Sequence, residues 1–109
     1  MSSTVRVQSK LCDKVSTITV SMTLEGDFLV KIESDCVNVQ HYAEGIQKLS
    51  MDDLVDKRNS LVFQRFFDVS MSANCLVPAG LMSAGWLEAG MVSRSRALKV
   101  GDSRVEYLE

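Results

Sequence analysis

Two runs of alternating apolar and polar residues constrain the fold of this chain more than any other feature. Val15–Thr23 and Phe28–Glu33 each place alternate apolar side chains on one face, the period expected of a half-buried strand. Gly26 lies between them in a short polar segment, and glycine tolerates the positive φ of a tight turn. The pattern therefore predicts a β-hairpin, and with it an antiparallel sheet whose second face is open to water.

The rest of the chain supplies one shorter strand before this hairpin and a series of helices after it. Apolar periodicity and end signals predict strands at Thr4–Gln8 and Arg104–Leu108 and helices at Val37–Leu49, Met51–Asp56, Leu61–Met71 and Pro78–Glu88. We expect a single domain over residues 1–109 of the two-layer α+β class. Its antiparallel sheet should have three to four strands, with helices packed on one face.

Two helical segments carry specific packing expectations. Pro78–Glu88 contains Gly80 and Gly85, which weaken a helix, so close packing against a neighbour has to offset that cost. Phe66 and Phe67 fall in the preceding helix, and as large aromatic side chains they are predicted to lie in the core.

Charge and composition exclude several function classes. The formal net charge is −2, and the basic residues form no stripe, so no nucleic-acid partner is expected. No apolar run resembles a signal peptide or spans a bilayer, which favours a cytoplasmic protein without membrane contact. The single histidine, His41, lies off the apolar stripe of its helix and is predicted to be solvated. Without a catalytic triad, a phosphate-binding loop or paired carboxylates, an enzyme is not expected.

The three cysteines carry the main functional hypothesis. Cys12 lies in the loop before the hairpin, Cys36 where a strand becomes a helix, and Cys75 before another helix. The hairpin places Cys12 and Cys36 at the same end of the sheet. An odd number of cysteines in a reducing compartment disfavours a disulfide framework. If Cys75 joins the other two, three thiolates suit zinc or an iron–sulfur cluster.

The surroundings of these cysteines suggest further ligands. Asp13 is the candidate fourth ligand, with Asp35, water or a group from a partner protein as alternatives. Asp35 is also predicted to be the N-cap of the following helix, which would leave Cys36 at its first position, where the helix dipole favours a thiolate.

A second interpretation remains open: the cysteines are packing residues, since cysteine is among the most buried residue types. The chain would then be a non-catalytic interaction module. Its contact surface would be an exposed sheet edge or the small-residue face of the Pro78–Glu88 helix.

The order and spacing of Cys12, Cys36 and Cys75 resemble the iron–sulfur cluster assembly scaffolds, the IscU proteins and the NifU N-terminal domain. The resemblance spans residues 4 to 90 and implies an IscU-like fold, a metal or cluster held by the three cysteines, and a protein partner in cluster or metal delivery. Lys14 and Asn74 stand where that family has an acid and a histidine. The chain also looks like a small uncharacterised prokaryotic family, mostly of anaerobic archaea, through its IESDC junction and later Cys-x-x-Pro.

Overall fold

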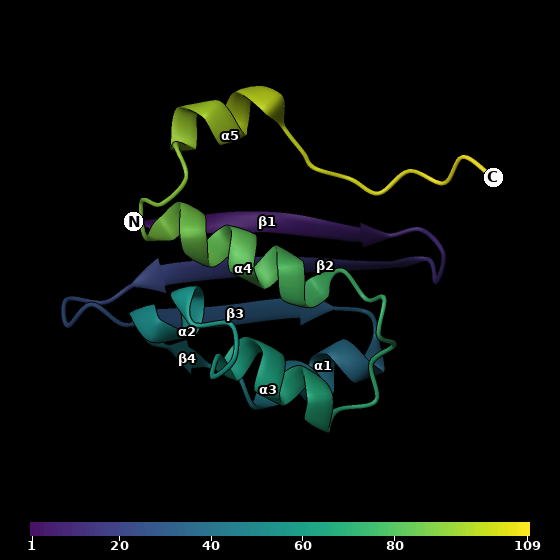
Figure 1. Ribbon diagram of the computed structural model, residues 1–109, viewed down its shortest axis with the longest axis horizontal. Coiled ribbons are helices and arrows are strands. Elements are labelled where there is room, and N and C mark those ends of the chain that lie inside the picture. The colour runs from purple at the N-terminus through teal and green to yellow at the C-terminus, as the bar shows by residue number, and fades with distance from the viewer.

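The computed structural model describes residues 1–109, and its centre is a four-stranded antiparallel sheet (Figure 1). The strands follow one another in the order β1-β2-β3-β4. They are β1 (Ser2–Ser9), β2 (Lys14–Met22), β3 (Phe28–Ser34) and the short β4 (Lys48–Leu49). Ile18 of β2 lies opposite Val5 on one side and Ile32 on the other, so the apolar positions share a face. The hairpin and the antiparallel sheet predicted from the alternation are confirmed.

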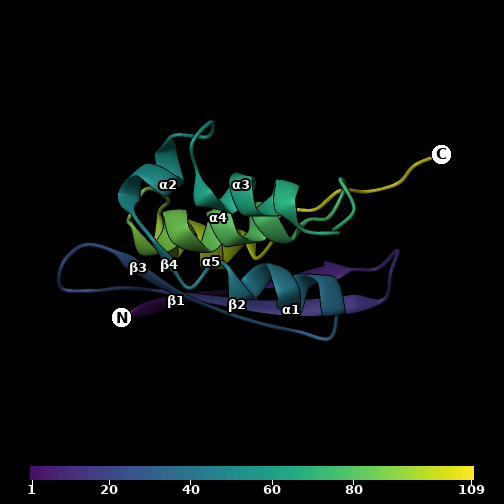
Figure 2. The same cartoon turned by 90° about the horizontal axis from the view of Figure 1, so that it is seen from below.

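Five helices complete the α+β fold. They are α1 (Val37–Glu44), α2 (Met51–Val55), α3 (Leu61–Asp68), α4 (Val77–Glu88) and α5 (Arg94–Val100). Helices α2, α3 and α4 lie on the same side of the sheet (Figure 2), and α4 packs across β1 and β2. No helix is both long enough and apolar enough to cross a bilayer.

The core fills the space between this sheet face and the helices. Gly80 of α4 lies directly on Val7 of β1, where a Cβ would collide, and Gly85 similarly faces Leu54 of α2. The close packing predicted to offset the weak α4 sequence is therefore confirmed, and the small-residue face of α4 is inside the protein. The buried cluster contains Val7, Ile18, Val20, Phe28, Val39, Tyr42, Ile46, Leu49, Leu54, Val62, Val77, Leu81 and Ala84.

The helix predicted over Val37–Leu49 is wrong in its second half. Helix α1 ends at Glu44, because Gly45 packs against the side chain of Arg65 and the chain turns there. The following residues return to the sheet, where the N–H of Val30 donates to the carbonyl of Gln47 at 3.0 Å. Ile46 and Leu49 of the predicted stripe are still buried, so their apolar character reflects the core and not a helix.

The prediction that Phe67 lies in the core is also wrong. Its side chain is 82% exposed, whereas Phe66 is partly buried against the core and Val62 is the fully buried residue of α3. Helix α3 ends at Asp68, three residues before the predicted Met71. Its inner face meets α4 and Tyr42 of α1, and Phe67 lies on the outer face.

The C-terminal prediction fails in a different way. A helix, α5, forms over Arg94–Val100 with the Ser93 hydroxyl accepting from the N–H of Arg96, a capping interaction that the sequence prediction missed. The predicted strand Arg104–Leu108 is not formed, because residues 101–109 leave the body of the protein and make no backbone hydrogen bond to another strand.

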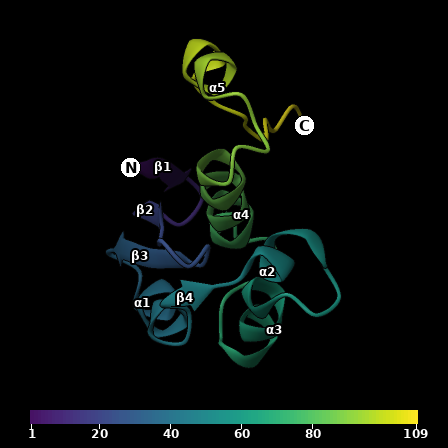
Figure 3. The same cartoon turned by 90° about the vertical axis from the view of Figure 1, so that its left-hand side faces the viewer.

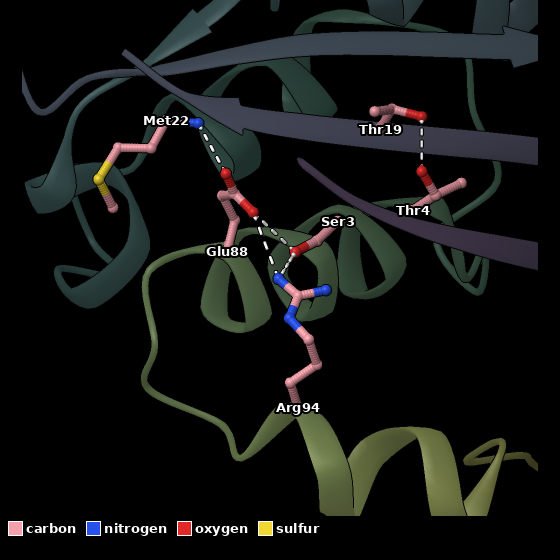
Figure 4. A network of polar contacts seen from close by, with 6 residues as sticks. All are labelled: Ser3, Thr4, Thr19, Met22, Glu88 and Arg94. Carbon is pink, nitrogen blue, oxygen red and sulfur yellow. Dashed lines mark hydrogen bonds and ion pairs between the residues drawn. The ribbon is translucent and has the colours of Figure 1, made fainter. Parts of the chain in front are cut away.

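One buried carboxylate joins four segments at the end of α4 (Figure 4). Glu88 accepts from the hydroxyl of Ser3 at 2.8 Å and from the N–H of Met22 at 2.9 Å, while Arg94 approaches it to 3.5 Å. Arg94 also donates to the oxygen of Ser3 at 2.7 Å. Because the Glu88 side chain is only 3% exposed, this network fixes the C-terminal end of α4 to the start of β1 and the end of β2.

Candidate functional site

Cys12 and Cys36 lie at the same end of the sheet, as the hairpin topology predicted. Cys12 belongs to the turn between β1 and β2, and the pairing of Ser16 with Ser34 places the end of β3 beside the start of β2. A hydrogen bond from the N–H of Val15 to the Oδ1 atom of Asp35, 3.1 Å long, joins the two segments directly.

Helix α4 brings Cys75 to this same end. The C-terminal residue of α4, Glu88, is bound at the start of β1, and Gly80 lies on Val7 near the end of that strand. The N-terminus of α4, with Cys75 just before it, therefore lies beyond Val7 at the end where β1 turns into β2 (right-hand side of Figure 1). We call this region, with Cys12, Cys36 and Cys75, the cysteine end.

The electrostatics of Cys75 agree with this convergence. Burial is the main cause that raises the pKa of the Cys75 thiol. The hydrogen bond from the Val77 N–H is the next largest effect and lowers that pKa, while the charges of Cys36 and then Cys12 raise it. Tyr42 is fully buried nearby, with its hydroxyl donating to the carbonyl of Val62 at 2.8 Å. Burial raises the pKa of Tyr42 most strongly, and Cys75 adds to that increase. Cys36 and Cys12 are thus near enough to Cys75 for their charges to act on its thiol.

Cys36 is held by its backbone, although not in the way predicted. The predicted N-cap, Asp35, is wrong: Cys36 itself is the N-cap of α1, and its side chain makes no capping hydrogen bond. Asp35 instead accepts from Val15, because its carboxylate points back to β2. The N–H of Cys36 donates to the hydroxyl of Ser34 at 3.1 Å, and that hydroxyl accepts from Ser16 at 2.8 Å.

The three thiols differ in their surroundings. Cys36 and Cys75 are partly buried and pack against the core, whereas Cys12 is exposed and its thiol lies 3.5 Å from the carbonyl of Ser9. Asp13, the candidate fourth ligand, is exposed in the same turn with a φ of 56°. In this structure, no three histidine, cysteine, aspartate or glutamate side chains are placed to hold one ion together. The donor types suit a soft metal, while their present positions do not form a finished site.

Sequence reasoning missed the residues that surround the thiols. Ser16 and Ser34 orient Cys36. The two serines are directly opposite in the observed hairpin, so working out the register from the predicted hairpin was the signal that could have revealed them. The proximity of Tyr42 to Cys75 had no sequence signal, because it depends on how α4 crosses the sheet. His41 is exposed, as predicted, and its carbonyl accepts from Arg65.

Comparison with known proteins gives the chain a family but no activity. No curated protein and no solved structure matches the sequence. One family model, described as a family of unknown function (DUF6951), matches residues 3–100, a stretch that includes the four strands apart from Ser2, all five helices and the three cysteines. The chain therefore belongs to the DUF6951 family of unknown function.

Proposed function

We propose that the cysteine end binds a soft or borderline metal, zinc or an iron–sulfur cluster, through the thiolates of Cys12, Cys36 and Cys75. The observation that carries this proposal is that every cysteine of the chain, from three separate segments, lies at one end of the sheet. Thiolate is the ligand that zinc and iron–sulfur clusters share. A bound cation would also favour the ionised form of the three thiols, because it would offset the repulsion between neighbouring thiolates.

The turn that carries Cys12 is the part of the site that must change on binding. Cys36 and Cys75 are fixed by the packing of α1 and α4, while Cys12 and Asp13 are exposed in a turn. Since no three donors are placed to hold an ion together, binding requires this turn to bring Cys12, with Asp13 as candidate fourth ligand, toward the other two thiols.

A role in delivery to a partner protein would suit the surface around the thiols. Leu11 and Val37, the neighbours of Cys12 and Cys36, are 74% and 75% exposed, so a partner that donates or receives the metal would find apolar side chains beside the ligands. Free thiols are maintained in a reducing compartment, so the cytoplasm is the proposed location.

The fold removes one of the two contact surfaces predicted for the alternative, an interaction module whose cysteines are packing residues. The small-residue face of α4 is buried against β1 and α2, so it is not the contact surface of such a module. The partial burial of Cys36 and Cys75 suits the packing interpretation, but the exposure of Cys12 does not. The open edge of β1 remains available as a contact surface.

The test is metal binding by protein purified without oxygen. We expect one zinc ion per chain, or an iron–sulfur cluster after reconstitution, and protection of all three thiols from alkylation by bound zinc. Replacing Cys12, Cys36 or Cys75 singly with Ser should weaken zinc binding at least about tenfold and expose the other two thiols to alkylation.

His41→Ala is the matched control, because it removes a potential metal ligand that is exposed on α1 and outside the cysteine end. Its affinity for zinc should equal that of the parent chain. Alkylation that proceeds at the same rate with and without zinc would show that the site does not exist. Thiols that react only after denaturation would instead support the packing interpretation.

A further inference from the structure

The outer edge of β1 is an unpaired strand edge without the usual protection. β1 pairs with β2 over eight consecutive residue pairs and has no neighbour on its other side. Such an edge presents free backbone N–H and C=O groups to any extended segment that approaches it. β1 contains no proline, its register with β2 is continuous, and Arg6 is its only charged residue. The edge is therefore suited to accept another strand.

Helix α5 lies over the position that such a strand would take. In Figure 3, α5 is on the same side of the sheet as α4 but beyond β1, where the sheet has already ended. No residue of α5 is buried, and Leu98 and Val100 are 72% and 53% exposed. The helix is attached through Arg94, which binds Ser3 at 2.7 Å. An additional strand beside β1 would extend the sheet beneath α5 and cover these apolar side chains.

The C-terminal segment has the sequence of a strand but pairs with no strand of its own chain. Val105 and Tyr107 alternate with Arg104 and Glu106, and Val105 and Tyr107 are 61% and 68% exposed. Residues 101–109 make no hydrogen bond that would attach them to the sheet, and the segment runs away from the body (Figure 1). The ion pair between Arg104 and Glu106, 3.7 Å long, is exposed and adds little.

We propose that the β1 edge binds the segment Arg104–Leu108 of a second copy of this chain, so that two copies exchange their C-terminal segments across a two-fold axis. The exchange satisfies the open edge and the unpaired segment of both copies at once, and a two-fold assembly is closed. The second copy is the occupant because, in this structure, the segment is separate from its own β1 and makes no hydrogen bond to it (Figure 3). The proposal uses none of the three cysteines and is independent of the metal site.

Charge and side-chain direction select one antiparallel register. Ser3, Val5 and Val7 point to the helix layer, while Arg6 points to the opposite face. Pairing Glu106 with Arg6 places Tyr107 opposite Val5 and Val105 opposite Val7, so apolar side chains meet under α5 and opposite charges meet outside.

The two neighbouring registers that preserve the two faces, shifted by two residues in either direction, are less favourable. One pairs Arg104 directly with Arg6, and like charges in directly opposite positions are destabilising. The other places Leu108 opposite Arg6 and Glu106 opposite Gln8, so it loses the pairing of opposite charges. A shift by one residue would turn Val105 and Tyr107 to the wrong face of the sheet. The pairing of Glu106 with Arg6 is therefore the one that the charges and the burial pattern of β1 favour.

Sedimentation velocity of the full chain over a range of concentrations tests the proposal. We expect a dimer, and a chain truncated after Ser103 should be monomeric. Glu106→Arg places like charges opposite Arg6 at both symmetry-related sites. It should raise the dissociation constant of the dimer about tenfold or more. The double variant Arg6→Glu with Glu106→Arg restores opposite charges and should recover most of that loss. Asp102→Arg, the same change of charge outside the paired segment, is the control and should leave the dimer intact.

Backbone amide exchange locates the contact. Amides of β1 should be more protected in the full-length dimer than in the chain truncated after Ser103. A full-length chain that is monomeric at all concentrations would overturn the proposal, as would a dimer unaffected by truncation. A third result would also overturn the proposal: a full-length monomer whose β1 amides are protected from exchange and lose that protection on truncation. In that case the segment would pair with the β1 edge of its own chain.

Discussion

Replacing Glu88 with Gln should destabilise the protein by much more than its small change in shape suggests. The carboxylate accepts hydrogen bonds from the hydroxyl of Ser3 and the N–H of Met22, with Arg94 at 3.5 Å. The amide of Gln keeps one acceptor oxygen and introduces an N–H₂ group. If the amide oxygen keeps its hydrogen bond with the N–H of Met22, the N–H₂ group faces the Ser3 hydroxyl and Arg94. The Ser3 hydroxyl can rotate to accept a hydrogen bond from this group, but the Arg94 guanidinium has no acceptor.

The magnitude follows from the burial of the site. A hydrogen bond to a charged group contributes about 1.5 to 3 kcal/mol, and the Glu88 side chain is only 3% exposed, so water does not replace the lost interaction. Arg94 is 37% exposed, and its ion pair with Glu88 is therefore screened and adds less than about 1 kcal/mol. We expect Glu88→Gln to lower the free energy of unfolding by about 2 kcal/mol.

Urea unfolding followed by far-ultraviolet circular dichroism measures this loss. The midpoint should fall while the slope of the transition stays unchanged, since the fold is the same. Glu33→Gln is the matched control, because Glu33 pairs with Lys31 at 3.0 Å but the two side chains are 68% and 74% exposed. That control should cost less than about 0.5 kcal/mol. Equal losses for the two variants would refute the conclusion that Glu88 holds α4, β1 and β2 together.

Two further predictions concern α4 and the cysteine end. Gly80→Ala should lower the free energy of unfolding by about 1 to 2 kcal/mol in the same urea assay. The new methyl group collides with buried Val7, and the gain in helix propensity only partly offsets the cost of that collision. An unchanged or higher stability would contradict the close packing of α4 on β1. Burial raises the pKa of Cys75 in the folded chain, so the unfolded chain loses its thiol proton first and stability should fall as the pH rises above about 8 to 9. Unfolding measured from pH 7 to 10 should show a weaker decline for Cys75→Ser than for Cys12→Ser, and identical declines would contradict this assignment.

The sequence alone determined the three long strands of the sheet and the placement of two of the three cysteines. Alternation with a period of two is a local property, so Val15–Thr23 and Phe28–Glu33 predicted the hairpin and its buried face without knowledge of the helices. Hairpin topology then placed Cys12 and Cys36 at one end. The small residues of α4 likewise predicted close packing, although not against which partner.

Tertiary structure decided what depends on distant segments. The buried stripe of Ile46 and Leu49 suited a helix or a return to the sheet, and contact of Gly45 with Arg65 and pairing with β3 selected the second. The arrival of Cys75 beside Cys12 and Cys36 depends on the direction in which α4 crosses β1 and β2, which the Glu88 network secures at its other end. Local sequence patterns cannot encode that direction, because it results from side-chain packing between residues more than 60 positions apart.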